Sequence, residues 1–427
     1  MLLPRLYHVT QKLARPQISS VKKVVCEELE KLGIRHNLPK GARVGITAGS
    51  RGINNIIEIL KAAIGYMRDC GFEPFLIAAM GSHGGGTAEG QLAVLASLGI
   101  TPATMGVPVL AGADAVDVGK TASGLYAYIN KHALSADGVL VVNRVKPHTG
   151  LVGSIQSGLT KGSVVGLGGP SGAAQFHGQG IGELPNALRQ IGAILVEKTP
   201  IMAGLAIIEN GYDETARIVG VKAKEFLTAE PGLLEEASKL MPRLPSDDVD
   251  LLIIEEMGKN YSGTGFDTTV VGRLRVNGFP EPTKPLIRRI VVLDLSEESH
   301  GNANGIGCAD FVTDKLVAKV DLDATYLNIL TTCFLQRGFI PLHFSSEKKT
   351  IEAAITTLRT IDVTKLRLMI IPNTLHLDTL YVSEALLPEL SARPDIQIAE
   401  QSLPFEFDAD LNMANRLLSR HQPAARS

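Results

Sequence analysis

Residues 142–180, VNRVKPHTGLVGSIQSGLTKGSVVGLGGPSGAAQFHGQG, dominate the first half of this chain. Three chemically active side chains, His148, Lys161 and His177, lie in this stretch among ten glycines. Glycine loses more backbone freedom on folding than any other residue, so such a density is destabilising in an ordinary core. A long loop inside a compact domain usually serves a site. The stretch is therefore a candidate functional segment.

Two interpretations of this glycine-rich stretch are open. It can be a long surface loop with incidental histidines, or a backbone packed closely around a bound cofactor. The second interpretation is favoured by apolar residues interleaved with the glycines, namely Leu151, Val152, Leu159, Val164, Val165 and Leu167.

The length of the chain predicts two domains, because 427 residues exceed what one hydrophobic core usually serves. We expect an N-terminal domain over residues 1–244 and a C-terminal domain over residues 245–427. A composition of 45% hydrophobic and 20% charged residues is that of an ordinary globular protein. A net charge of -2 without a long basic run argues against a nucleic-acid partner.

Targeting signals and cysteine chemistry are also informative. No apolar run approaches the roughly 20 residues that span a bilayer, and the N-terminus lacks the apolar core of a signal peptide. We therefore expect a cytoplasmic protein without a membrane partner. The four cysteines have no metal-ligand spacing and are expected to be buried thiols. They are Cys26, Cys70, Cys308 and Cys333.

Apolar runs and helical periodicity in the first half predict an α/β domain with parallel, buried strands. The expected strands are 43–47, 75–80, 138–143 and a hairpin of 202–209 with 215–221, and the expected helices are 21–32, 53–70, 88–98 and 232–241. Thr87 is the expected N-cap of the third helix.

Unusual side chains follow three of these strands, where ligands of parallel sheets bind. They are Arg51, His83 and His148. The loop 81–87, GSHGGGT, also leads into the N-terminus of a helix, which favours an anion such as phosphate. Any one of the three side chains can be structural, but their common placement favours a site.

The pattern restarts after residue 249 and predicts a second α/β domain. The expected strands are 249–257, 288–295, 338–344 and 365–374, and the expected helices are 309–318, 349–359 and 380–390. The predicted fold class is therefore α/β, with two α/β domains of mostly parallel sheets and an active-site cleft between them.

An ordered set of motifs resembles the nickel-dependent lactate racemase family, whose cofactor is a nickel-pincer nucleotide. The resemblance is strongest over residues 43–220. The matching segments are AGSRG (48–52), GSHGGGT (81–87), VKPHTGLVG (145–153) and SGLTKGSVVG (157–166), followed by a histidine in QFHGQG (175–180).

The resemblance implies a role for each matching residue. Lys161 would carry the covalently attached nickel-pincer nucleotide, and His177 would coordinate the nickel. His83 and His148 would be the acid/base pair on the two faces of the substrate carbon, and Arg51 would hold the substrate carboxylate. Cofactor biosynthesis enzymes would then be partners of the protein.

Further contacts follow from the resemblance or from position along the chain. Ser50, Gly84 and Gly85 would contact the cofactor. Here Gly52 replaces the family's proline and Gly84 its arginine after the loop histidine. In the C-terminal half, the polar segment 255–267 follows a strand and would close over a substrate.

In that half, the expected substrate ligands are Lys259, Tyr261 and Arg273, although no Tyr-Gln pair of the family is present. The implied function is a 2-hydroxy acid racemase or epimerase, an isomerase that acts through a 2-oxo acid. The alternatives are an isomerase of a non-lactate substrate with the same cofactor, and a non-catalytic relative that binds a nucleotide-like ligand. Oligomeric state does not follow from the sequence.

Overall fold

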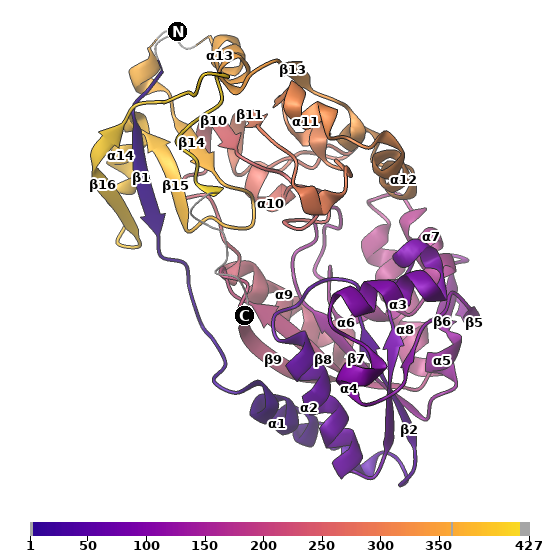
Figure 1. Cartoon of the computed structure of the whole chain (residues 1–427). Coiled ribbons are helices and arrows are strands. Elements are labelled where there is room, and N and C mark those ends of the chain that lie inside the picture. The colour runs from indigo at the N-terminus through magenta and orange to yellow at the C-terminus, as the bar shows by residue number, and fades with distance from the viewer. Residues whose placement is uncertain (1–2, 360–361, 419–427) are drawn as a thin grey trace. The chain divides into compact units, whose positions relative to one another are not determined.

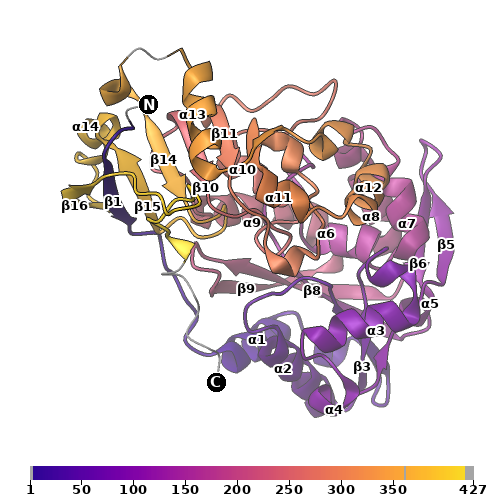
Figure 2. The same ribbon diagram turned by 45° about the horizontal axis from the view of Figure 1, so that its top comes forward.

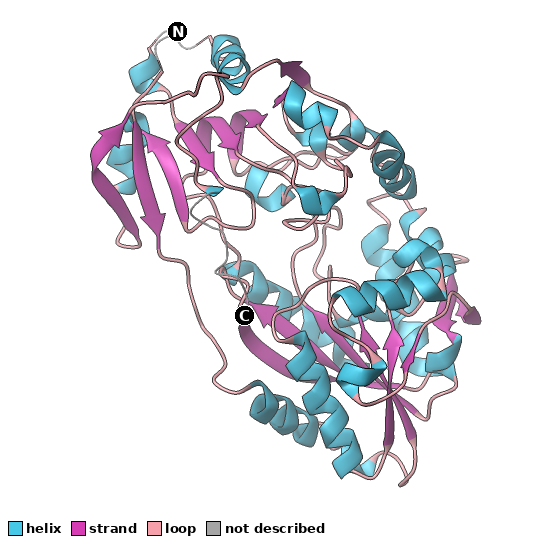
Figure 3. Cartoon of the chain, in the orientation of Figure 1, coloured by secondary structure: helices cyan, strands magenta, loops and turns pink. Residues whose placement is uncertain are grey.

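The computed structural model describes residues 3–359 and 362–418, which form two compact units (Figure 1). Ala14–Met241 is the N-terminal domain. The described residues outside that range, 3–13 together with those from Pro242 onward, form the C-terminal domain. Each domain has its own sheet with helices against it (Figure 3).

The N-terminal domain is built on a six-stranded sheet of order β4-β3-β2-β7-β8-β9. Its strands are β2 (Arg43–Ala48), β3 (Glu73–Ala78), β4 (Val109–Leu110), β7 (Gly138–Arg144), β8 (Ile201–Glu209) and β9 (Thr215–Lys222). A separate ribbon joins β5 (Ala115–Lys120) to β6 (Tyr126–Asn130). All neighbours in the main sheet are parallel except β8 and β9, whose antiparallel pairing is visible in Figure 2.

Helices cover both faces of this sheet because alternate strand residues point to opposite sides. The helices are α1 (Val21–Lys31), α2 (Ile56–Asp69), α3 (Ala88–Ser97), α4 (Pro102–Met105), α5 (Lys131–Leu134), α6 (Leu159–Lys161), α7 (Gly169–His177), α8 (Leu184–Lys198) and α9 (Phe226–Leu240). Ile46 packs with α1 and α2 in one core cluster. Val141 packs with α8 and α9 in a second cluster on the other face.

The strands and hairpin expected in the first half are confirmed to within two residues at each end. The Thr87 cap is confirmed as well, since its hydroxyl accepts a hydrogen bond from Gly90 N at 3.1 Å.

The glycine-rich stretch is not a continuous loop. From Leu159 to His177 it is largely helical, because α6 continues into a π-helical turn, η3 (Gly162–Gly166), and then α7. Close packing explains the glycines: a Cβ at Gly166 would lie 2.8 Å from Ala79 O. The backbone of this stretch therefore packs closely against the neighbouring loop of the sheet, and the expected packing around a bound cofactor stays a prediction.

The C-terminal domain contains an eight-stranded sheet of order β13-β12-β11-β10-β14-β15-β1-β16. Its strands are β1 (Leu6–Gln11), β10 (Asp248–Ile254), β11 (Leu286–Val292), β12 (Phe311–Thr313), β13 (Leu342–Phe344), β14 (Leu368–Ile371), β15 (Thr379–Ser383) and β16 (Ile396–Leu403). Its helices are α10 (Thr268–Val271), α11 (Asp314–Ala318), α12 (Leu322–Thr332), α13 (Glu347–Thr357) and α14 (Leu387–Leu390). Pairings from β13 to β14 are parallel, and those from β14 to β16 are antiparallel.

Three expectations that concern the C-terminal domain are wrong. The segment 309–318, expected as one helix, contains strand β12 and is helical only from Asp314 to Ala318. The N-terminal residues do not belong to the first domain, because β1 pairs with β15 and β16 and completes the second sheet. The segment 380–390, expected as one helix, begins with strand β15. Strand β15 pairs with β1 and β14, and its Leu380 and Val382 are buried, so sheet pairing overrides the helical pattern.

The described residues include no helix long and apolar enough to cross a membrane. All four cysteines are free thiols. Cys70 and Cys308 are buried as expected, whereas Cys26 is only partly buried and Cys333 is exposed.

Candidate functional site

Three loops of the N-terminal domain meet at one edge of its sheet. Strands β3, β2 and β7 are adjacent and parallel, so their carboxyl ends lie side by side. The loops that follow these ends carry His83, Arg51 and His148. The topology thus brings together the three side chains singled out at strand ends.

Backbone contacts attach the lysine-bearing turn to the same edge. Gly81 N donates a hydrogen bond to Gly166 O at 3.1 Å, which joins the His83 loop to η3. A Cβ at Gly81 would lie 3.0 Å from Val165 O, and the residue has a left-handed φ of 60°. Only glycine fits this approach without strain. Lys161, immediately before η3, is therefore carried by a segment that packs on the loop of His83.

Electrostatic coupling links Arg51, Lys161 and His177 in a row. Burial, and then the charge of Arg51, lowers the pKa of Lys161 to about 7. Burial, and then the charge of Lys161, lowers the pKa of His177 to about 4. Burial and the charge of Arg144 lower the pKa of Arg51. The charge of Arg51 shifts the pKa of Lys161, and the charge of Lys161 shifts that of His177, so the three side chains lie near one another.

This row lacks compensating partners. Among the described residues, none makes a side-chain hydrogen bond or ion pair with Arg51, Lys161 or His177. Arg51 is exposed by surface area even though nearby protein lowers its pKa, and Lys161 and His177 keep part of their surface. A half-buried lysine near an unpaired guanidinium is unfavourable for folding, and shifted pKa values such as those of Lys161 and His177 are typical of functional sites. A ligand from solvent can reach them.

The two histidines expected as acid and base are both engaged by neighbours. His83 Nδ1 lies in hydrogen-bond contact with Ser50 Oγ. His148 Nδ1 accepts from Gly150 N at 3.1 Å, so the neutral ring carries its proton on Nε2. Ser50, expected as a cofactor contact, therefore has a second task in orienting the His83 ring.

The glycine loop before α3 folds back on its own helix. Gly84, Gly85 and Gly86 all have left-handed φ values, between 66° and 68°. A Cβ at Gly84 would lie 2.5 Å from the carbonyl carbon of Gly90 in the first turn of α3. This close approach requires glycine at Gly84 for the fold itself. Cofactor contacts of Gly84 and Gly85 stay predictions.

Sequence reasoning missed a carboxylate that joins two of the loops. Glu209, at the end of β8, accepts from Asn54 N at 2.7 Å and pairs with the Arg144 guanidinium. Asn54 follows Arg51 by three residues, and Arg144 precedes His148 by four. A charged residue ending an apolar strand was the available signal. Glu209 thus ties the Arg51 loop to the His148 loop.

The three C-terminal residues expected as substrate ligands are occupied within their own domain. Lys259 Nζ donates to Gly263 O at 2.7 Å and to Asn328 Oδ1 at 2.5 Å. The hydroxyl of Tyr261 donates to Glu256, and burial raises the pKa of Tyr261. These contacts hold the 255–267 segment in place.

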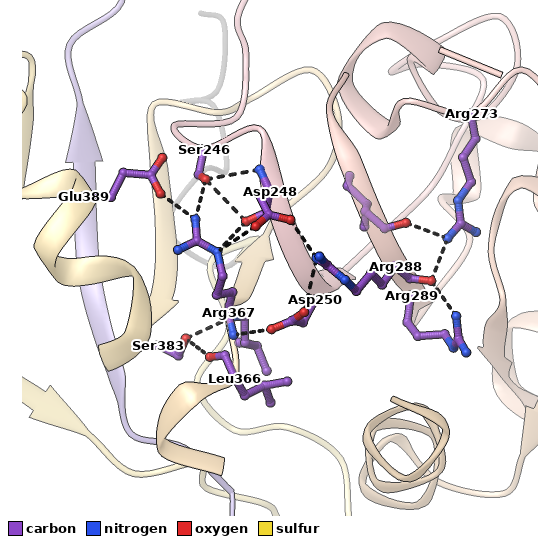
Figure 4. Close-up of polar contacts among 12 residues, drawn as sticks. Ser246, Asp248, Asp250, Arg273, Arg288, Arg289, Leu366, Arg367, Ser383 and Glu389 are labelled. Carbon is purple, nitrogen blue, oxygen red and sulfur yellow. Dashed lines mark hydrogen bonds and ion pairs between the residues drawn. The ribbon is translucent and has the colours of Figure 1, made fainter. Parts of the chain in front are cut away.

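Arg273 is 9% exposed and its guanidinium is used by the fold. It donates to Cys308 O and Ile287 O, each at 3.0 Å. It also donates to Arg288 O at 3.2 Å (Figure 4). It also pairs with Asp310 at 2.8 Å. The role that the structure supports for Arg273 is therefore structural, in place of the expected substrate contact.

Within the described ranges, no three or more His, Cys, Asp or Glu side chains are grouped so that they could hold a metal ion. The cofactor implied by the resemblance would draw only one metal ligand, His177, from the chain.

No protein-family model and no curated protein matches the chain. Among solved structures, the chain is similar to the lactate racemase apoprotein from Thermoanaerobacterium thermosaccharolyticum. The TM-score is 0.46 and the sequence identity 14%, and the similarity covers 82% of this chain and 86% of that chain. At this distance the likeness assigns no activity, which must be argued from the site residues.

Proposed function

We propose that the protein is a racemase or epimerase of a 2-hydroxy acid that uses a nickel-pincer nucleotide attached to Lys161. The observation that carries the proposal is the row of basic side chains Arg51, Lys161 and His177, which have no counter-ion among the described residues, in a domain whose adjacent strand ends also carry His83 and His148. Such a row is costly to the fold, and a bound anionic cofactor and substrate would remove much of that cost.

The donor chemistry of the row fits such a cofactor. A lysine with a pKa of about 7 is largely neutral at slightly alkaline pH and can form a covalent bond through its amine. A histidine with a pKa of about 4 is neutral at pH 7 and offers a nitrogen lone pair to a metal. The bound group would supply a hydride acceptor for the carbon that is inverted.

The remaining chemistry belongs to side chains of the chain. Arg51 would bind the substrate carboxylate through its planar guanidinium, which accommodates two carboxylate oxygens. His83 and His148 would take and return the hydroxyl proton, one for each face of the carbon. While Nδ1 of His148 accepts the Gly150 N–H, Nε2–H can only donate a hydrogen bond to the substrate. Taking the hydroxyl proton at Nε2 would require the ring to release that contact and carry its own proton on Nδ1.

The substrate need not be lactate. The polar groups of Lys259 and Arg273 are tied into their own domain, so they provide no ready contacts for a small 2-hydroxy acid. We expect a larger or differently substituted 2-hydroxy acid to be preferred.

The test uses protein produced together with the cofactor's biosynthetic enzymes. Single-enantiomer 2-hydroxy acids, lactate included, are incubated with it and analysed by chiral chromatography. Formation of the opposite enantiomer, lost in His83→Ala and retained in the control His343→Ala, would support the proposal. His343 suits the control because it pairs with Asp314 in the C-terminal domain. Modified protein without turnover of any substrate would instead favour a non-catalytic ligand-binding relative.

A further inference from the structure

The helical segment that carries Lys161 is hydrogen-bonded at its start to a buried carboxylate. Glu230, on α9, is 1% exposed. Both of its carboxylate oxygens lie 3.1 Å from Thr160 N, and the Thr160 hydroxyl donates to it as well. A backbone hydrogen bond from Leu159 adds to these. Glu230 thus accepts the first N–H groups of the turn directly before Lys161.

The buried Glu230 carboxylate needs hydrogen-bond donors for its charge and space beside the turn. Burial raises the pKa of Glu230, while its bonds to Thr160 and Leu159 oppose that rise. A negative charge at the N-terminus of a helical segment is favourable, since free N–H groups point toward it. A Cβ at Gly158 would lie 2.1 Å from Glu230 Oε1, so glycine is required for the carboxylate to reach the turn.

A second side chain holds the same turn from the sheet. Asn143, near the end of β7, donates through Nδ2 to Gly158 O at 2.7 Å. Its Oδ1 accepts from Arg144 N at 2.9 Å, which fixes the amide orientation. A Cβ at Gly162 would lie 2.9 Å from Asn143 Nδ2. The residues on both sides of Lys161 are therefore clamped between α9 and the sheet.

We propose that Glu230 is a positioning residue for Lys161: its carboxylate fixes the start of the turn and so holds the lysine side chain in its half-buried place directly before η3. The inference rests on the proposed function for its purpose, because a fixed, neutral amine is what attachment of a cofactor requires.

The chain supplies a matched control in its other domain. Glu255 is 0% exposed and accepts from Leu417 N at 2.8 Å and Leu418 N at 2.9 Å. Burial raises the pKa of Glu255 too. Glu255→Gln and Glu230→Gln therefore both place an amide N–H against backbone donors in a buried site, but only Glu230 adjoins Lys161.

The experiment measures Lys161 in the cofactor-free protein. Trace labelling with acetic anhydride across pH, followed by peptide mass spectrometry, gives the midpoint at which the Lys161 amine becomes reactive. Lys239 is an internal reference, since it lies on the same helix as Glu230 with 71% of its side chain exposed. The wild-type midpoint is expected near 7.

In Glu230→Gln we expect the midpoint to rise by about one unit or more, because a displaced amine regains solvent. Glu255→Gln should keep the wild-type midpoint. Thr160→Val should shift the midpoint in the same direction as Glu230→Gln, whereas Thr160→Ser should keep the wild-type midpoint. These two variants provide the test if Glu230→Gln does not fold.

An unchanged midpoint in Glu230→Gln, or in Thr160→Val where Glu230→Gln does not fold, would overturn the proposal, as would an equal shift in Glu255→Gln. A wild-type midpoint like that of Lys239 would overturn it too. Because no cofactor is present, the result is independent of the proposed activity. Failure of Lys161 to be modified in loaded protein would remove the proposed function and leave the positioning result standing.

Discussion

Lys161 in the N-terminal domain and Lys259 in the C-terminal domain are both half-buried, yet their surroundings differ. Lys259 donates to Gly263 O and Asn328 Oδ1. Lys161 has no side-chain hydrogen bond or ion pair with a described residue, and the charge of Arg51 opposes its protonation. A half-buried cation with hydrogen-bond partners costs the fold less than one without them, and function can explain why the second is kept.

The largest expected effect lies at the N-terminal edge. His83→Ala and His148→Ala should each reduce turnover about 10²- to 10⁴-fold, the usual contribution of a general acid or base. Folding and cofactor content should be unchanged. The measurement is the initial rate of enantiomer conversion on loaded protein. Near-normal rates in both variants would make the pair structural and remove the contrast between the domains.

Arg51→Gln should weaken substrate binding about 10- to 100-fold, since a charged hydrogen-bonded contact contributes roughly 1.5–3 kcal/mol. KM should rise more than kcat falls. Arg273→Gln is the comparison, because its guanidinium is used inside the C-terminal domain. An increase in KM for Arg273→Gln that matched Arg51→Gln would restore Arg273 as a substrate ligand.

A pair of methionine variants tests the contrast through stability. Lys161→Met should stabilise the cofactor-free protein at pH 7, on the order of 1 kcal/mol or more, by removing a desolvated charge. Lys259→Met should destabilise it by about 1–3 kcal/mol, because the half-buried Gly263 O and Asn328 Oδ1 lose their donor. The measurement is the free energy of unfolding in urea of the domain that carries each substitution. Destabilisation by Lys161→Met would mean that the amine has favourable partners.

The pH dependence gives the sign of the Lys161 effect. Its pKa is lowered from 10.5 to about 7 in the folded protein. Between these values the unfolded chain binds more protons, so stability rises with pH across this window. The advantage of Lys161→Met should therefore shrink as pH is raised from 7 toward 10. An advantage that stayed constant would show that Lys161 is not desolvated.

The smallest effect on the reaction rate is expected for Tyr261→Phe. The variant removes the hydroxyl bonded to Glu256 and leaves a half-buried carboxylate with one partner fewer. Stability should fall by about 1–3 kcal/mol while the rate of the loaded enzyme changes little. A large loss of rate without loss of stability would assign Tyr261 to the substrate after all.

Parts of the fold follow directly from the sequence. Strands β2, β3 and β7 are almost continuous apolar runs because they are buried on both faces, and their ends located Arg51, His83 and His148. Strand β1 was not predictable in this way. Its partners β15 and β16 lie more than 360 residues away in the chain, so no local pattern identifies them.

The sequence predicted the parts of the site that depend on the chemistry of single residues. It did not predict the parts that depend on tertiary contacts. The helical form of 159–177 was hidden because glycine disfavours helices, and here tertiary contacts such as Gly81 N to Gly166 O override that preference. Glu230 was hidden because it lies 70 residues from its partner Thr160. Nothing local to either residue predicts that pairing.

The central claim, that Lys161 carries a cofactor, is tested most directly by the mass of its peptide. Protein made with the cofactor's biosynthetic enzymes should show added mass on the peptide that contains Lys161, together with stoichiometric nickel. Both should be absent from Lys161→Ala and retained in Lys259→Ala. Added mass on another peptide, or nickel fully retained in Lys161→Ala, would contradict the account.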